Sequence, residues 1–266
     1  MFLLYYLIKS RELRIQYCSD LHLEFPHNKS WLAEYPLMPT AETLIIAGDT
    51  HYLGPEYAKL DFFKWASDNY KRTFVISGNH EYYGGYDLSL HQKPFKWEIQ
   101  RNVFLLNNHV EIIEDISFLF STFWSHIYPE NEKFVSSGVN DFYKIMINQR
   151  RLTVDDFNKL HNEAYTFIRE NLKPLNDKTV VVTHHLPTPL CNSPEFEGSP
   201  INNAFVVDTT DFITKSDIDY WIYGHIHRNI GNGTMLGDTT MVCNQLGYVH
   251  MNEHYNFSRD SFIEIA

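Results

Sequence analysis

Five short segments of the chain place metal-binding types of side chain directly after a predicted strand. In two of them one residue separates Asp20 from His22 and His225 from His227, so each pair can reach a common ion where the backbone turns. Imidazole and carboxylate together suit zinc, manganese, iron or nickel better than calcium or magnesium. A lone aspartate after a strand is usually a turn residue, but five such segments predict a metal centre. The segments are Ser19-Asp20-Leu21-His22, Gly48-Asp49, Gly78-Asn79-His80-Glu81, Thr183-His184-His185 and Gly224-His225-Ile226-His227.

The strands that must carry these segments are short apolar runs bounded by turn residues. Buried strands are predicted over residues 14–19, 44–47, 73–77, 179–183 and 220–223. Helices are predicted over residues 55–70 and 154–172, the second starting at a capping box of Thr153 and Asp156. Residues 103–106, 111–113 and 116–120 are predicted as consecutive strands of a meander, and residues 241–243 and 262–265 as late strands. Alternating strands and helices predict a layered α/β fold.

No internal repeat or linker divides the chain, so residues 1–266 are expected to form a single domain. Two irregular stretches, residues 125–147 and 187–203, are expected to be loops over the site. The apolar residues 1–8 are interpreted as an added edge strand or the product of an upstream start codon. This segment is too short to cross a bilayer and lacks the order of regions of a signal peptide.

The composition limits the classes of molecule that the chain is expected to bind and the compartment in which it is expected to lie. The formal net charge of −11 argues against a broad surface for long nucleic acid, which draws on many lysine and arginine contacts to phosphates. A small phosphorylated substrate stays compatible with this charge, because bound cations would reverse the local field. The three cysteines are far apart and form no CxxC pair, which favours a reducing, cytoplasmic location. The sequence gives no indication of oligomeric state or of a membrane partner.

The ordered set DLH, GD, GNHE, THH and GHIH resembles the calcineurin-like metallophosphoesterases from residue 14 to about residue 250. The resemblance implies a four-layer αββα sandwich of two mixed β-sheets flanked by helices. It also implies that Asp20 and His22 bind a first metal ion and that Asp49 bridges this ion to a second one. By the same resemblance, the second ion is bound by Asn79, His225 and His184, with His185 as the alternative to His184. His227 would bind the first ion. His80 would protonate the leaving group or hold the phosphate.

The activity implied by this resemblance is hydrolysis of a small phosphomonoester or phosphodiester. The cofactors would be two divalent metal ions, with manganese expected first and iron, zinc, cobalt or nickel as alternatives. A hydroxide shared by two ions about 3.5–4 Å apart would be the nucleophile. A metal-dependent nuclease and a non-catalytic metal-binding scaffold remain the alternative functions.

The chain departs from the protein serine/threonine phosphatases of this superfamily, which carry GDxVDRG and RGNHE. Tyr52 stands where the second aspartate of the first motif would be, and Ser77 replaces the arginine of the second. The phosphate-clamping arginines are therefore absent at these positions, which argues against a protein phosphatase. The missing aspartate also leaves open which group orients His80, with Glu81 and His51 as candidates.

Three further segments resemble a bacterial and phage-like subgroup of the same superfamily. Residues 119–124 are similar to its GATLW stretch, residues 140–142 to its MNDY and residues 244–248 to its NPxGY. The resemblance leaves two readings, pocket wall or loop packing, for Trp124, His126, Asn140 and Asp141. A structural role is expected for Asn244 and Tyr248. Glu24 is expected at the surface, with a position beside the metal ligands as the alternative.

Overall fold

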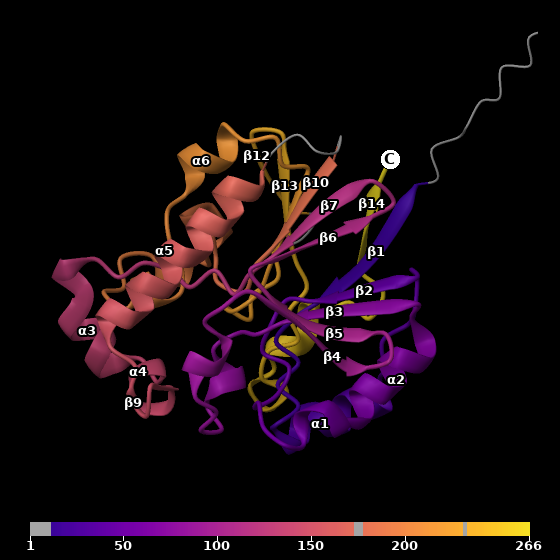
Figure 1. Cartoon of the computed structure of the whole chain (residues 1–266), viewed down its shortest axis with the longest axis horizontal. Helices are drawn as coiled ribbons and strands as arrows, with labels where there is room; N and C mark the ends of the chain where they lie inside the picture. The colour runs from indigo at the N-terminus through magenta and orange to yellow at the C-terminus, as the bar shows by residue number, and fades with distance from the viewer. Residues whose placement is uncertain (1–11, 173–177, 231–232) are drawn as a thin grey trace, which may run out of the picture.

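The computed structural model describes residues 12–172, 178–230 and 233–266. Two six-stranded β-sheets pack face to face, and helices cover the outer face of each (Figure 1). This is the four-layer αββα sandwich of two mixed sheets that the sequence predicts.

The first sheet has the strand order β14-β1-β2-β3-β5-β4. Its four central strands are parallel, and the edge strands β14 and β4 pair antiparallel. The central strands are almost wholly buried apolar runs, as expected where both faces of a parallel sheet are covered. The bounds are β1 Leu13–Cys18, β2 Thr43–Ile46, β3 Arg72–Ile76, β4 Phe95–Gln100, β5 Val103–Asn107 and β14 Phe262–Ile265.

The second sheet has the order β12-β13-β11-β10-β7-β6. Strands β13, β11, β10 and β7 are parallel, and the edge strands β12 and β6 pair antiparallel. The bounds are β6 His109–Ile113, β7 Ile116–Phe120, β10 Lys178–Val182, β11 Tyr220–Tyr223, β12 Thr234–Leu236 and β13 Thr239–Cys243. A separate two-stranded ribbon pairs β8, Met146–Ile147, with β9, Arg150–Arg151.

Three hydrophobic layers hold the sandwich together. Between the sheets, Ile45 and Phe74 of the first sheet belong to one buried cluster with Phe118 and Val180 of the second. Helices α1, Pro26–Glu34, and α2, Asp61–Asn69, cover the first sheet, while α5, Val154–Asn171, and α6, Thr210–Thr214, cover the second (Figure 1). The predicted capping box starts α5, where the Thr153 and Asp156 side chains each bond the other's backbone N–H. The α/β layers thus bring the carboxyl ends of the parallel strands to one edge.

Several predicted elements differ from the structure. The helix expected over residues 55–70 is broken at Leu60, whose φ of −55° and ψ of 129° separate a 3-10 turn, Tyr57–Lys59, from α2. The break buries Tyr57 completely and lets its ring pack 5.1 Å from that of Phe63. The irregular stretch 125–147 contains two short helices, α3 Glu132–Gly138 and α4 Asp141–Lys144. Residues 187–203 form a loop with three 3-10 turns, as a loop was predicted there.

The predicted meander is wrong in one respect. Strands β6 and β7 form the expected hairpin, but β5 pairs with β3 in the other sheet. The chain crosses between the sheets at Asn108, which adopts a φ of 45° and accepts a 2.7 Å hydrogen bond from the Ser121 hydroxyl. The edge strand proposed for residues 1–8 lies outside the described residues. Within the described ranges, no helix combines the length and apolar character that a membrane crossing needs.

Candidate metal centre

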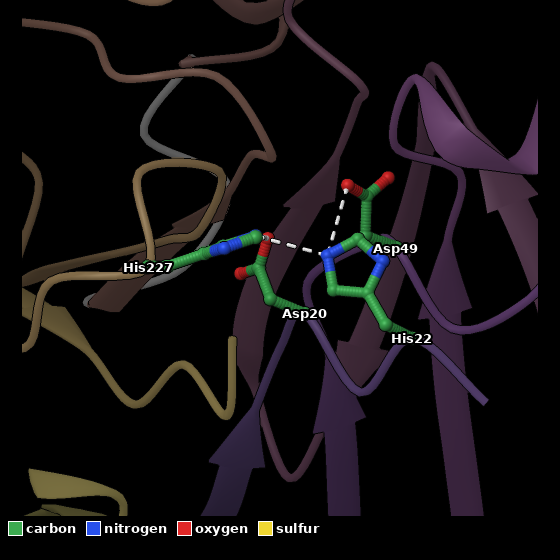
Figure 2. Close-up of side chains that lie close together, drawn as sticks. All are labelled: Asp20, His22, Asp49 and His227. Carbon is green, nitrogen blue, oxygen red and sulfur yellow. Dashed lines mark hydrogen bonds and ion pairs between the residues drawn. The ribbon is translucent and has the colours of Figure 1, made fainter. Parts of the chain in front are cut away.

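The five predicted metal-binding segments come together where strands of both sheets end. Asp20 and Asp49 follow β1 and β2 of the first sheet, and His225 and His227 follow β11 of the second. The Asp20 carboxylate accepts the backbone N–H of His225 at 3.0 Å, which joins the two sheets at this edge. Figure 2 shows the side chains of Asp20, His22, Asp49 and His227 close together, with Asp20 and His22 on one segment of the chain and Asp49 and His227 on two others.

A first cluster consists of Asp20, His22, Asp49 and His227, whose ligand atoms all lie within 4.8 Å of one another. Nε2 of His22 is 2.9 Å from Nε2 of His227 and 3.7 Å from Oδ2 of Asp49. Oδ1 of Asp20 is 3.4 Å from the same nitrogen of His227. Two carboxylates and two imidazoles thus surround one small volume.

A second cluster consists of Asp49, His184 and His225. Nε2 of His184 lies 3.4 Å from Oδ2 of Asp49 and 3.2 Å from Oδ1 of Asn79. Asp49 is therefore common to both clusters, and its Oδ2 faces a histidine of each. Its Oδ1 accepts the backbone N–H of His80 at 2.9 Å, which fixes the direction of the carboxylate.

The second ring nitrogens show that these residues fit divalent cations. Nδ1 of His22 lies 3.0 Å from Glu24, Nδ1 of His227 lies 2.7 Å from Glu253, and Nδ1 of His184 lies 2.9 Å from the Ala47 carbonyl. When Nδ1 donates to such an acceptor, Nε2 of the neutral ring presents a lone pair, the arrangement typical of metal-ligating histidines. The buried Nε2 of His225 has no hydrogen-bond partner within the described part of the chain.

The carboxylates of the clusters raise the pKa of two of the histidines, whereas burial lowers that of His22 and His225. Burial alone would lower the pKa of His184, but the Asp49 carboxylate raises it to about 10. For His227 the same opposition of burial against hydrogen bonds to Asp20 and Glu253 gives a pKa of about 9. Burial would raise the pKa of Asp49, yet nearby histidines, His184 first, hold it well below its usual value. Buried carboxylates that stay ionised need a positive partner, and a divalent cation provides one.

The backbone at the clusters adopts conformations that non-glycine residues rarely take. Asp20, His22, Asp49, His225 and His227 have φ values of 54°, 46°, 54°, 86° and 53°. Each such residue costs of order 1–3 kcal/mol, and clusters of them are typical of functional sites. The fold therefore holds these five side chains in place at the expense of local stability.

Two glycines allow the loops to approach this closely. Gly48 has a φ of 91°, and a Cβ there would overlap the His184 ring. A Cβ on Gly224 would lie 2.7 Å from Oδ2 of Asp20. A side chain at either position would push a candidate ligand out of its cluster.

Glu24 lies beside the candidate ligands, which was the less favoured of the two expectations for it. Its surface position is wrong, because only 3% of its side chain is exposed. Its Oε1 lies 3.0 Å from Nδ1 of His22 and 2.9 Å from Nδ1 of His80. The alternating spacing of Asp20, His22 and Glu24 along the chain was the available indication of this role.

Glu81 and His51, the two residues expected to orient His80, have other hydrogen-bond partners. Glu81 accepts the backbone N–H groups of Asp49, Thr50 and Gly78 at 2.7–3.0 Å, which ties the two loops together. Nδ1 of His51 lies 3.0 Å from the Tyr52 carbonyl. The carboxylate that contacts His80 in the structure is therefore that of Glu24, 2.9 Å from Nδ1.

A cavity of about 300 Å³ opens over both clusters. Asn140 and Asp141 line it, as one reading of the sequence predicted, whereas Trp124 and His126 are not among its lining residues. Tyr248, for which a structural role was expected, also lines it, with its hydroxyl 3.2 Å from Nε2 of His80.

Two other expectations concern residues beside the cavity. Asn244 has the expected structural role, since its amide donates to the carbonyls of Tyr17 and Ser258. His185, the alternative to His184, belongs to neither cluster, and its ring lies 4.2 Å from that of His225. The geometry therefore favours His184 as the candidate ligand.

Comparison with known families agrees with this geometry. Residues 13–229 match the family model of the calcineurin-like phosphoesterases. The chain belongs to this family. An uncharacterised protein of Acanthamoeba polyphaga mimivirus is 30% identical over 282 residues, which cover 94% of this chain and 96% of that protein. The family implies a metal-dependent phosphoesterase, and the Asp and His clusters are able to bind its divalent ions.

A solved structure with the same fold is that of phosphopantetheinyl hydrolase from Mycobacterium tuberculosis. It aligns with this calcineurin-like phosphoesterase at a TM-score of 0.66 and 17% identity, and the alignment covers 96% of each chain. At this identity the likeness shows the common sandwich fold.

The two clusters predict how many ions each variant binds. We expect two manganese ions per wild-type chain after equilibrium dialysis, measured by elemental analysis. His227→Ala and His225→Ala should each retain one, because each removes a ligand from a different cluster. His91→Ala, which removes a buried histidine outside both clusters, should retain two. Unchanged counts in the first two variants would contradict the assignment.

The contact between Glu24 and His22 predicts that Glu24 affects metal affinity. Glu24→Gln keeps the size of the side chain but removes the carboxylate that holds His22. We expect the affinity of the first cluster for manganese to fall about 10–100-fold, the usual effect of losing such a partner. Glu264→Gln alters an exposed carboxylate paired with Arg14 and serves as the matched control. Equal affinities of the two variants would show that Glu24 does not support His22.

Proposed function

We propose that this protein hydrolyses a small phosphate ester with two divalent metal ions, manganese being the first expectation. The observation that carries the proposal is the position of Asp49, whose Oδ2 faces a histidine of each cluster. A carboxylate in this position supports a dinuclear centre, because one oxygen can bind two ions. Asp20, His22 and His227 would hold the first ion, and Asn79, His184 and His225 the second.

When bound, such a pair of ions lowers the pKa of water and stabilises negative charge on the phosphoryl oxygens. The chain itself positions the proton donor. With Nδ1 of His80 bonded to Glu24, Nε2 is the nitrogen that faces the cavity beside Tyr248. Burial would lower the pKa of His80, but the Asp49 and Glu24 carboxylates raise it, so the ring can carry a proton on both nitrogens. As water adds to phosphorus and loses one proton to solvent, the bond to the ester oxygen breaks, and Nε2 of His80 would give its proton to the departing alcohol.

The alternatives are supported less well. A scaffold that has lost turnover would not need His80 oriented by a buried carboxylate over the same cavity. A nuclease acting on long nucleic acid would need a basic surface, and the net charge is −11. A small ester also suits a cavity of about 300 Å³, at the lower end of small-molecule sites.

Turnover tests this proposal. Metal-stripped protein reloaded with manganese should hydrolyse bis-p-nitrophenyl phosphate, p-nitrophenyl phosphate or both, measured by the release of p-nitrophenol. Asp49→Asn should lower kcat/KM about a thousand-fold, because the charge stabilisation that the metal ions supply amounts to several kcal/mol. Asp211→Asn changes a fully exposed aspartate and should leave the rate unchanged.

Two outcomes would contradict the proposal. If the protein binds two ions per chain and turns over neither ester with manganese, iron, zinc, cobalt or nickel, the proposal fails and the scaffold is favoured. Equal rates for Asp49→Asn and wild type would also contradict it.

A further inference from the structure

The two walls of the cavity over the metal clusters come from segments far apart in the chain. One wall is the end of α3 and the start of α4, residues 138–141, and the other is the loop segment 196–205. They meet where Gly138 faces Ile201, since a Cβ on that glycine would lie 3.2 Å from the isoleucine Cγ2. Apart from residues 204 and 205, both belong to the stretches 125–147 and 187–203 that were expected to form loops over the site.

Both walls, and Ile226 after β11, present apolar side chains to the cavity, next to the polar Asn140, Ser199 and Asn202. Val139, Phe196, Ile201, Phe205 and Ile226 all line the cavity. The Phe205 ring stacks on that of His225 at 5.0 Å between centroids and 26° between planes. The apolar surface therefore begins directly at a candidate metal ligand, where part of a bound ester would lie.

The walls carry no cation to meet a phosphate. None of the described residues that line the cavity is lysine or arginine. Asp141 brings a buried carboxylate instead, which accepts the Asn79 amide at 2.9 Å. Arg228, next in the chain after His227, is ion-paired through Nε with Glu195 at 2.8 Å, and about half of its side chain is exposed.

We propose that this site selects phosphodiesters that carry an uncharged, partly apolar alcohol group over phosphomonoesters. The inference rests on the proposed function. A monoester is largely a dianion at neutral pH, and sites that bind dianionic phosphate commonly use arginine as a bidentate partner. A diester has one negative charge, and its second alcohol group would cover the apolar wall instead of meeting Asp141.

The reaction balances with water alone. Water adds to phosphorus, one ester bond breaks, and the products are an alcohol and a phosphomonoester. The second alcohol group stays on the phosphorus throughout, so contacts with the wall are available from binding to product. Once formed, the monoester carries the additional charge that these walls do not neutralise, which favours its release.

Three substrates with the same leaving group test the inference. They are p-nitrophenyl phosphate, methyl p-nitrophenyl phosphate and phenyl p-nitrophenyl phosphate, which differ only in the second substituent on phosphorus. For the manganese-loaded protein at neutral pH we expect kcat/KM to rise in that order, with at least tenfold between the monoester and the phenyl diester.

Two variants separate the apolar contact from the charge. Phe196→Ala should lower kcat/KM for the phenyl diester about tenfold, through KM, and leave the methyl diester little changed. Ser199→Arg, which adds a cation to the lining, should lower the ratio of diester to monoester turnover about tenfold. The matched controls are Phe262→Ala, at a phenylalanine of similar exposure on β14, and Ser261→Arg, which adds a cation just before that strand.

The outcomes distinguish this inference from the function on which it rests. Turnover of the monoester at least equal to that of both diesters would overturn the inference and leave the phosphoesterase intact. So would a Phe196→Ala variant that loses the same factor on all three esters. Absence of turnover for all three, in protein that binds two ions per chain, would overturn both.

Discussion

The Asp49 carboxylate is the interaction on which the rest of the site depends. Its Oδ1 is fixed by the backbone N–H of His80, which leaves Oδ2 directed at a histidine of each cluster. The loop that carries it is fixed in turn, because Glu81 binds the backbone of Asp49 and of Gly78 together. Two ions can share this oxygen only if both loops keep this position. In the proposed dinuclear centre, the spacing of the ions would therefore depend on these backbone hydrogen bonds as well as on the ligands.

Hydrophobic packing in the αββα sandwich offsets the unfavourable free energy of forming such a centre. Five candidate ligands have positive φ, and two carboxylates are buried among histidines, each an unfavourable contribution to folding. Three hydrophobic layers, formed mainly by parallel strands and the helices on them, offset these costs. Bound divalent ions would reduce the cost further by neutralising Asp20 and Asp49. The parallel strands form the hydrophobic core, and the candidate ligands directly follow their carboxyl ends at one edge of the sandwich.

The sequence predicted the parts of this arrangement that depend on short local patterns. Buried strands are continuous apolar runs, and the ligand candidates follow them directly, so both could be read from neighbouring residues. The support for the ligands could not, because it depends on residues that meet only in three dimensions. Glu253 reaches His227 from 26 positions away, and Glu24 reaches His80 from 56. The exchange of β5 into the first sheet and the break at Leu60 likewise depend on tertiary packing.

The most direct test of this account is the anomalous scattering of crystals of the manganese-loaded protein, recorded near the manganese absorption edge. The account predicts two peaks about 3.5–4 Å apart, with the Asp49 carboxylate between them and His22 and His227 at one ion, His184 and His225 at the other. A single peak, or two peaks that do not share Asp49, would contradict the central claim.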